Sequence, residues 1–237
     1  MSGPQLFSLV LPCRNQADHI EEILGRYIKA LEVLPCAFEL LVVPNACTDA
    51  TVAAVERLAA ADPRVKAIPL AQGGWGRAVR AGLAAASGDL VGYTNTARTE
   101  PESVPELVSK CIEGGSCVVK ATRHSRQAPL RSIGSRLYNF EAKLLFGVST
   151  WDVNGTPKVF PREVYEAVNL TAPGDMIDLE LMAQVARKRV RVIEVPVGGF
   201  KRHGGKSSTT LKSAWGMYAG AAKMWWAGPT PARRVAA

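Results

Sequence analysis

Cysteine and histidine are scarce in this sequence and irregularly spaced. The 237 residues contain five cysteines, an odd number, and none shows the C-x-x-C spacing of a zinc or redox site. The histidines His19, His124 and His203 are scattered without metal-ligand spacing, and we expect His19 to lie on the surface of a helix. The pattern predicts buried free thiols in a reducing compartment, with no disulfide framework.

Long apolar runs are absent as well. No window of about 18 uncharged apolar residues occurs, which is the length that a membrane-spanning helix needs. The first residues show no secretory signal, so we expect a cytoplasmic chain. No G-x-S-x-G motif is present, and the glycine-rich stretch 73–79 lacks the third glycine of a dinucleotide-binding fingerprint.

Negative charge is in the minority. The net charge is +8 and the isoelectric point is about 9.4, which suits phosphorylated ligands, anionic lipid or nucleic acid. Basic residues concentrate in 120–143 and 187–206. For Arg187 to Arg191 a solvated helix end is the simpler explanation, because cations suit that end of the dipole. No nucleic-acid-binding motif accompanies these stretches, so we expect no nucleic-acid partner.

What the sequence does contain is an alternation of apolar strands and amphipathic helices. Strands are predicted at 6–12, 38–44, 65–70, 89–94, 116–121 and 190–197, with a short strand in 152–168 before a helix that starts near Arg162. The other helices are predicted at 16–34, 48–61, 73–87, 104–112, 130–147, 176–189 and 209–226. Strands that are apolar on both faces indicate a largely parallel sheet covered by helices. Ligands of such sheets bind at the carboxyl ends of the strands, here residues 12–16, 44–49, 71–76 and 94–98. We predict one domain over 1–208, a C-terminal helix over 209–227 and a disordered tail over 228–237.

Five segments carry a resemblance to a known family. They are "SLVLPCRNQADHI" (8–20), "ELLVVPNACTDATVAAVERLA" (39–59), "GGWGRAVRAGLAAASGDLVGYTNTA" (73–97), "DVNGTPKVFPRE" (152–163) and "IEVPVGGFKRHGGKSS" (193–208). In this order and spacing they resemble family 2 glycosyltransferases of the GT-A fold, especially dolichyl- and polyprenyl-phosphate mannose synthases. The resemblance implies a single Rossmann-like α/β domain with a mostly parallel sheet flanked by helices. It also implies an inverting enzyme that moves a hexose from a nucleotide-diphosphate sugar to an acceptor, such as a polyprenyl phosphate.

The sequence departs from that family mainly at its acidic positions. The family usually has a glutamate where Gln16 stands, two aspartates at Pro44 and Asn45, and an Asp-x-Asp motif where Asn95, Thr96 and Ala97 stand. Divalent cations need carboxylates to offset their charge, so we expect no tight metal site, and Mg²⁺ or Mn²⁺ at most weakly bound. Three acids of the family pattern are kept: Asp49, Asp152 and Asp178.

The resemblance assigns site residues to two groups and one catalytic candidate. The expected nucleotide-binding residues are Pro12, Arg14, Asn15, Gln16, Asn45, Gly74, Gly76, Arg77 and Asn95. The expected phosphate- or acceptor-binding residues are Arg123, Arg131, Ser135, Asn154, Lys158, Arg202 and Lys206. Guanidinium groups bind phosphate in bidentate fashion, so this basic set could neutralise a diphosphate without a metal; ordinary surface charge is the alternative. Asp152 is the candidate general base, or alternatively the cap of an Asx turn.

Two further alternatives stay open. The chain is either an active transferase or a non-catalytic relative that keeps a basic phosphate pocket. The last helix places Leu211, Trp215, Tyr218, Ala222 and Trp225 on one stripe beside lysines. That stripe suits the headgroup layer of an anionic membrane, with the protein peripheral on the inner face. A helix packed on the sheet or in a homodimer explains it equally well.

Overall fold

The structure is a computed structural model that describes residues 3–123, 129–198 and 211–228. Its centre is a sheet of seven strands in the order β3-β2-β1-β4-β6-β5-β7. The strands are β1 (Leu6–Cys13), β2 (Ala37–Pro44), β3 (Val65–Ala67), β4 (Leu90–Tyr93), β5 (Cys117–Arg123), β6 (Lys158–Pro161) and β7 (Arg191–Val197). Only β6 runs antiparallel among these seven strands. The expected single α/β domain with a mostly parallel sheet is confirmed.

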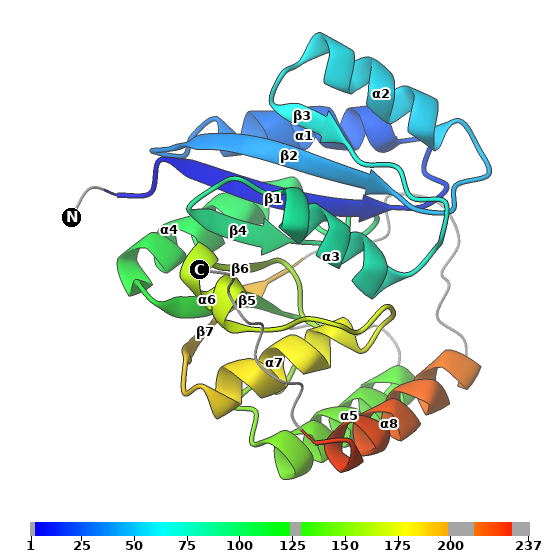
Figure 1. The fold of residues 1–237 in the computed structure, drawn as a ribbon, viewed down its shortest axis with the longest axis vertical. Coiled ribbons are helices and arrows are strands. Elements are labelled where there is room, and N and C mark those ends of the chain that lie inside the picture. Colours follow the sequence, from blue (N-terminus) through cyan, green and yellow to red (C-terminus); the bar gives the residue numbers. More distant parts are fainter. Residues whose placement is uncertain (1–2, 124–128, 199–210, 229–237) are drawn as a thin grey trace, which may run out of the picture.

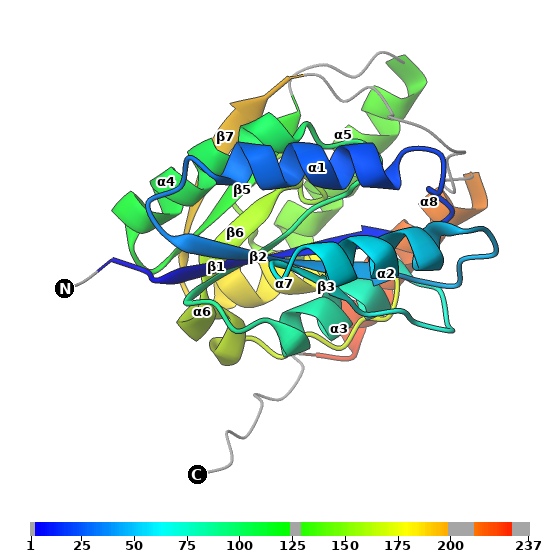
Figure 2. The same ribbon diagram turned by 90° about the horizontal axis from the view of Figure 1, so that it is seen from above.

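Helices cover both faces of the sheet (Figures 1 and 2). One face carries α1 (Ile20–Leu31), α2 (Thr51–Ala61) and α4 (Val104–Gly114), which follows the short 3-10 helix η1 (Pro101–Ser103). The other carries α3 (Trp75–Ala85), α6 (Arg162–Ala167) and α7 (Ile177–Arg187). Burial on both faces explains the unbroken apolar runs: in β1, Leu9 and Leu11 belong to the first core and Val10 to the second.

A third layer stands at one end of the molecule. Helices α5 (Pro129–Phe146) and α8 (Leu211–Trp226) lie side by side there (Figure 1). The ring of Tyr138 meets that of Tyr218 edge to face at 5.8 Å. The buried face of α8 contains Met217, Tyr218 and Ala221, whereas Ala222 and Trp225 are exposed. Of the predicted stripe, Tyr218 lies on this packed face, Ala222 and Trp225 do not, and the side chains of Leu211 and Trp215 lie outside the described residues. Helix α8 packs mainly against α5.

Most helices and strands are as the sequence predicts, but the ends of some elements and the burial of His19 differ from the prediction. The first helix begins at Ile20 and ends at Leu31, so it is shorter at both ends than predicted. The third strand ends at Ala67, and beyond it only Leu70 forms an isolated bridge, to Asn45. The prediction of a surface-exposed His19 is wrong: its side chain is buried, and its Nδ1 lies 2.5 Å from Asp18 Oδ1.

All five cysteines are free, but the prediction that they are buried holds for only three of them, since Cys36 and Cys47 are partly exposed. Cys13, Cys111 and Cys117 are buried, and burial raises the pKa of the Cys13 and Cys111 thiols. Among the described residues, no helix has both the length and the hydropathy to cross a bilayer.

Candidate functional site

The candidate site lies at the edge of the sheet where β1, β2, β4, β5 and β7 have their carboxyl ends. Because β6 runs in the opposite direction, its first residue, Lys158, lies at the same edge. The loop that leads into β6 carries Asp152 and Asn154. The topology thus brings the two nucleotide-side loops, the Asn95 loop and the acceptor-side loop to one edge, as expected for parallel sheets.

The loops after β1 and β2 are held together by side chains. Asn15 has a φ of +50°, a conformation that asparagine tolerates better than most residues. Its Nδ2 donates to Thr48 Oγ1 at 3.1 Å, and its Oδ1 accepts the Thr48 N–H at 2.8 Å. Asp49 accepts the N–H of Ala17 at 3.1 Å. These contacts fix the backbone beside the exposed Arg14, so the retained Asp49 acts as a support of the loop.

Gln16 stands where the family usually has a carboxylate, and it is nearly buried. Its N–H donates to Thr51 Oγ1 at 2.8 Å, which anchors the backbone. Its side-chain Oε1 is buried and has no hydrogen-bond partner among the described residues. An unpaired buried acceptor is costly. Contact of the Gln16 amide with a nucleotide stays a prediction.

Asn45 ties three loops together. Its Nδ2 donates to the carbonyl of Cys13 at 2.9 Å, and its Oδ1 accepts the N–H of Gly74 at 3.2 Å. A carboxylate at this position could not donate to the Cys13 carbonyl. The amide thus has a structural role that explains its presence, and contact with a nucleotide stays a prediction.

The glycine turn before α3 is shaped by a close approach of the chain. Gly74 has a φ of +142°, and a Cβ on it would lie 2.5 Å from the carbonyl oxygen of Pro173. A Cβ on Gly76 would lie 2.3 Å from that of Ala172. The N–H of Arg77 donates to the Pro173 carbonyl at 2.9 Å, so segment 172–174 satisfies a free N–H at the start of α3. Packing alone requires both glycines, and their contact with a nucleotide stays a prediction.

The loop after β4 does not fit a divalent cation. Asn95 Oδ1 accepts the N–H of Ala97 at 3.0 Å, and Thr96 Oγ1 donates to the Pro12 carbonyl at 2.8 Å. Ala97 contributes only a buried methyl group. Among the described residues, no three His, Cys, Asp or Glu side chains gather as a metal site requires. The side chain of Asn95 is thus used within the loop, and that of Thr96 holds the loop to β1.

One row of the sheet beneath the site is charged and buried. In register across β4, β6, β5 and β7 stand Tyr93, Lys158, Lys120 and Glu194. The side chains of both lysines are fully buried. The next row on the same face of β4 and β6 is apolar, with Val91 opposite Phe160. The core therefore changes from apolar to charged immediately below the candidate site.

Asp178, near the start of α7, compensates the first of these lysines. Lys158 Nζ forms an ion pair with Asp178 Oδ1, which also accepts the Tyr93 hydroxyl at 2.8 Å. Trp75 Nε1 donates to Asp178 Oδ2 at 3.0 Å. Burial, and then the charge of Asp178, raise the pKa of Tyr93, so this residue remains a hydrogen-bond donor. Direct contact between Lys158 and an acceptor stays a prediction; in the structure its ammonium is bound to Asp178.

The acceptor-side loop is tied to α5. Val153 N–H donates to Asn139 Oδ1 at 3.0 Å, and Asn139 Nδ2 donates to Ser135 Oγ at 3.3 Å. Asn154 Oδ1 is buried and has no partner among the described residues. Ser135 thus belongs to the support of the loop, whereas Asn154 offers an unused acceptor. Asp152 is 6% exposed, and its backbone N–H donates to Thr150 Oγ1 at 3.1 Å.

The expected basic set is only partly visible. Arg123 ends β5 and Arg131 lies in the first turn of α5, but their side chains lie outside the described residues. Arg202 and Lys206 lie outside them entirely.

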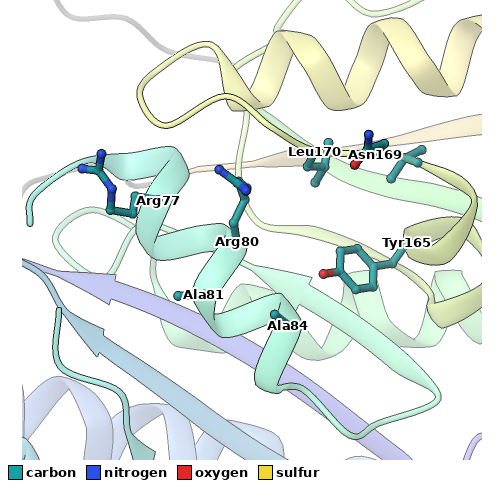
Figure 3. A pocket seen from close by; sticks show the side chains of 8 residues that line it. Arg77, Arg80, Ala81, Ala84, Tyr165, Asn169 and Leu170 are labelled. Atoms are coloured by element: carbon teal, nitrogen blue, oxygen red, sulfur yellow. The ribbon is translucent and has the colours of Figure 1, made fainter. Parts of the chain in front are cut away.

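Arg77, one of the expected nucleotide-binding residues, lines a pocket of about 400 Å³ together with Arg80, opposite Tyr165 and Asn169 (Figure 3). Arg80 Nη1 donates to the Thr171 carbonyl at 2.9 Å, so the basic wall of this pocket is held to the segment before α7.

Several residues of the site were not found from the sequence. Glu194, Tyr93, Trp75 and Asn139 carry no local signal, because their roles depend on contacts between distant segments. Lys120 could have been found, since it interrupts the apolar strand "SCVVKA". In the sequence it also begins the basic stretch 120–143.

Comparison with known proteins decides the family. The model of "Glycosyl transferase family 2" matches residues 8–168, about two thirds of the chain. The chain belongs to glycosyl transferase family 2. The match spans all five loops described above, from the loop after β1 to the acceptor-side loop before β6.

Individual family 2 relatives agree with this assignment. Glycosyltransferase AglD of Haloferax volcanii is 30% identical over 236 residues, covering 92% of this chain and 37% of the relative. An undecaprenyl-phosphate 4-deoxy-4-formamido-L-arabinose transferase of Shewanella sediminis is 28% identical, covering 83% of this chain and 56% of the relative. The chain thus spans about a third to a little over half the length of these two relatives.

A solved structure shares the fold. Glucosyl-3-phosphoglycerate synthase of Mycobacterium tuberculosis, in complex with Mn²⁺, uridine diphosphate and glucosyl-3-phosphoglycerate, superposes with a TM-score of 0.70 at 22% identity. The similarity covers 92% of this chain and 77% of that chain. The GT-A fold expected from the sequence is therefore confirmed.

Proposed function

We propose that this family 2 protein transfers a hexose from a nucleotide-diphosphate sugar to a polyprenyl phosphate. The observation that carries the proposal is the family match over residues 8–168 together with the acceptor-side loop, which keeps Asp152 at the carboxyl edge of the sheet. The Shewanella relative is named for an undecaprenyl-phosphate acceptor, and the fold neighbour was solved with a uridine diphosphate. In this proposal Asp152 acts as the general base or orients the acceptor.

We further propose that transfer does not need a tightly held divalent cation. The fold neighbour was solved with Mn²⁺, but the loop after β4 in this chain offers an amide, hydroxyls and a methyl group. Positive charge from the basic set, Arg123, Arg131, Arg202 and Lys206, would neutralise the diphosphate instead.

One observation favours a second function, a non-catalytic phosphate-binding module. Polar side chains of the loop after β4 hydrogen-bond to one another, with Thr94 Oγ1 2.7 Å from Thr99 Oγ1.

A thermal-shift screen followed by a transfer assay distinguishes these functions. The protein is screened with uridine and guanosine diphosphate sugars, with Mn²⁺ and with EDTA, and each stabilising donor is then incubated with undecaprenyl phosphate. Labelled sugar in the lipid fraction supports the transferase, and its loss in Asp152→Asn supports the role of Asp152. Stabilisation by nucleotides without transfer supports the binding module. No stabilisation by any nucleotide contradicts both.

The proposed acceptor keeps its chain in a bilayer, so we propose peripheral contact with the inner face of an anionic membrane. On α5, Leu137, Phe140 and Leu144 are 57%, 58% and 74% exposed and follow helical spacing on one side. Lys143 lies over the exposed ring of Trp151, with Nζ 3.8 Å from the ring centroid. Apolar side chains with adjacent cations suit an anionic lipid surface. Trp225 and Trp226 of α8 are exposed as well.

Co-sedimentation with liposomes tests this surface. We expect the protein to bind vesicles of anionic lipid at low salt and to be released at high salt, because salt screens the attraction. Phe140→Glu/Leu144→Glu should abolish binding, while the matched control Val33→Glu, at a side chain that is 74% exposed after α1, should not. If both variants bind like the wild type, the α5 face is not the membrane contact. A dimer in solution that only the α5 variant disrupts would assign this face to a homodimer.

A further inference from the structure

The fully buried Lys120 on β5 has an unusual surrounding. Its ammonium donates to the carbonyl of Ala121 at 2.9 Å and lies 3.4 Å from Glu194 Oε1. Its direct neighbour across the sheet is another buried lysine, Lys158. Like charges opposite one another in a sheet are destabilising, and buried charges need partners. Because Asp178 compensates Lys158, anions other than Asp178 must compensate Lys120.

Asp152 is one of those anions, as Gly155 shows. A Cβ on Gly155 would lie 2.9 Å from Lys120 Nζ and 3.0 Å from Asp152 Oδ2. The ammonium and the carboxylate therefore flank the same small space beside the glycine. That Cβ would also lie 2.1 Å from the Ala121 carbonyl, which no side chain tolerates. The glycine at 155 is what allows the Asp152 loop to come this close to β5.

A second path joins Lys120 to the same aspartate. Glu194, on the other side of Lys120, accepts a hydrogen bond from the Thr150 hydroxyl. Thr150 Oγ1 in turn accepts the backbone N–H of Asp152 at 3.1 Å. The ammonium and the Asp152 carboxylate thus border the same space beside Gly155, and the ammonium is also connected to the Asp152 backbone through Glu194 and Thr150.

We infer that Lys120 is the positioning residue of Asp152: its buried ammonium fixes the orientation of the Asp152 carboxylate and holds that carboxylate in its ionised form. This inference deepens the proposed function, since it rests on Asp152 acting at the acceptor. Lys120 itself does not touch the acceptor, because its side chain is fully buried.

The ionisation of Lys120 gives the inference a pH signature. Burial, followed by the charge of Lys158 on β6, lowers the pKa of Lys120 to about 8, while Asp152 in the loop and Glu194 on β7 act to raise it. On β4 and α7, Tyr93 and Asp178 face Lys158. Below pH 8 Lys120 is therefore a cation that holds Asp152, and above pH 8 it becomes neutral and this hold is lost.

The test is a titration of the Asp152 carboxyl by carbon NMR, assigned with Asp152→Asn. Lys120→Met should raise the Asp152 midpoint by one pH unit or more, because it removes the adjacent cation. Lys120→Arg keeps the charge and should move the midpoint by less than half a unit. Lys110→Met removes an exposed lysine of α4 and serves as the matched control, with no change expected. An unchanged Asp152 midpoint in folded Lys120→Met overturns the inference.

Thr150→Val covers the case in which Lys120→Met does not fold. It removes only the hydroxyl between Glu194 and Asp152, and we expect the Asp152 midpoint to rise by half a unit or more. An unchanged midpoint there also overturns the inference. Neither titration needs a substrate, so its failure is distinct from failure of the proposed transfer. In the transfer assay, Lys120→Met should lower kcat at unchanged KM for the donor, and Lys120→Arg should lack the decline above pH 8.

Discussion

The buried ion pair between Lys158 and Asp178 allows a quantitative prediction about stability. Asp178 receives three donors at once: the Lys158 ammonium, the Tyr93 hydroxyl at 2.8 Å and the Trp75 indole N–H at 3.0 Å. Lys158 and Asp178 are 0% and 5% exposed, so solvent cannot replace a lost partner. Removing one member of a buried pair costs about 3–5 kcal/mol, because the other charge is left uncompensated. Each buried donor left without an acceptor adds about 1–3 kcal/mol.

We therefore expect Asp178→Leu to lower the free energy of unfolding by about 4–8 kcal/mol, from about 3–5 kcal/mol for the unpaired Lys158 and about 1–3 kcal/mol for the fully buried Tyr93 hydroxyl. That is a large share of the roughly 5–15 kcal/mol of a typical domain. Lys158→Met should cost about 3 kcal/mol, since Asp178 keeps its two neutral donors. The double variant Lys158→Met/Asp178→Leu should be more stable than the sum of the two single effects by about 2–3 kcal/mol, because no charge is left unpaired. Urea unfolding followed by circular dichroism measures all three.

The exposed pair of Lys110 and Glu106 on α4, 3.9 Å apart, provides the matched control. The same double-mutant cycle there should give a coupling below about 0.5 kcal/mol, as for other exposed pairs of this spacing. If the effects at Lys158 and Asp178 add within about 0.5 kcal/mol, the two residues do not act as a pair. The assignment of Asp178 to structural support would then be wrong.

Two further predictions concern the basic set and a buried carboxylate. Alanine at Arg123, Arg131 or Arg202, the arginines of the basic set, should weaken uridine diphosphate binding by about 1.5–3 kcal/mol each in calorimetry. Alanine at the exposed Arg187 or Arg189 should change it little. Equal losses at every position would indicate a diffuse charge effect. Burial raises the pKa of Glu39, but hydrogen bonds from Lys66, Ser8 and Ser87 outweigh it and lower this pKa to about 2. The folded pKa is below the unfolded one, so Glu39 should contribute about 3 kcal/mol above pH 4.5, lost as the pH falls towards 2. Unfolding at pH 7 and pH 2 should show that Glu39→Gln destabilises the protein only at the higher pH, and an equal effect at both would contradict it.

The sequence was informative where structure depends on local pattern. The strands β1 and β2 were predicted from their apolar runs, because a strand buried on both faces is apolar at every position. Helix α1 was predicted from its amphipathic spacing, because only one of its faces is buried. The order of the strand-end loops also followed, since parallel strands bring their carboxyl ends to one edge. The burial of His19 could not be predicted from helix periodicity. Its position depends on a hydrogen bond from its backbone N–H to the Gln16 carbonyl and on the contact of its ring with Asp18.

The candidate site was harder to predict from the sequence, because its charged residues pair with residues in distant segments of the chain. Lys158 is predicted as an acceptor-binding residue by resemblance, yet its partner Asp178 lies 20 residues away in another element. Asn45 was predicted to recognise a nucleotide, whereas the structure gives its amide two backbone partners from separate loops. Hydrogen-bond partners of this kind are set by topology and register, which residue type alone does not specify.

The central claim is that this family 2 chain transfers a sugar without a divalent cation. The most direct measurement is the initial rate of labelled sugar transfer to undecaprenyl phosphate, from the donor selected by thermal shift, in EDTA and in Mn²⁺. The account predicts rates that agree within about twofold and are lost in Asp152→Asn. A tenfold or greater dependence on Mn²⁺, equivalent to about 1.4 kcal/mol of transition-state stabilisation, would contradict it.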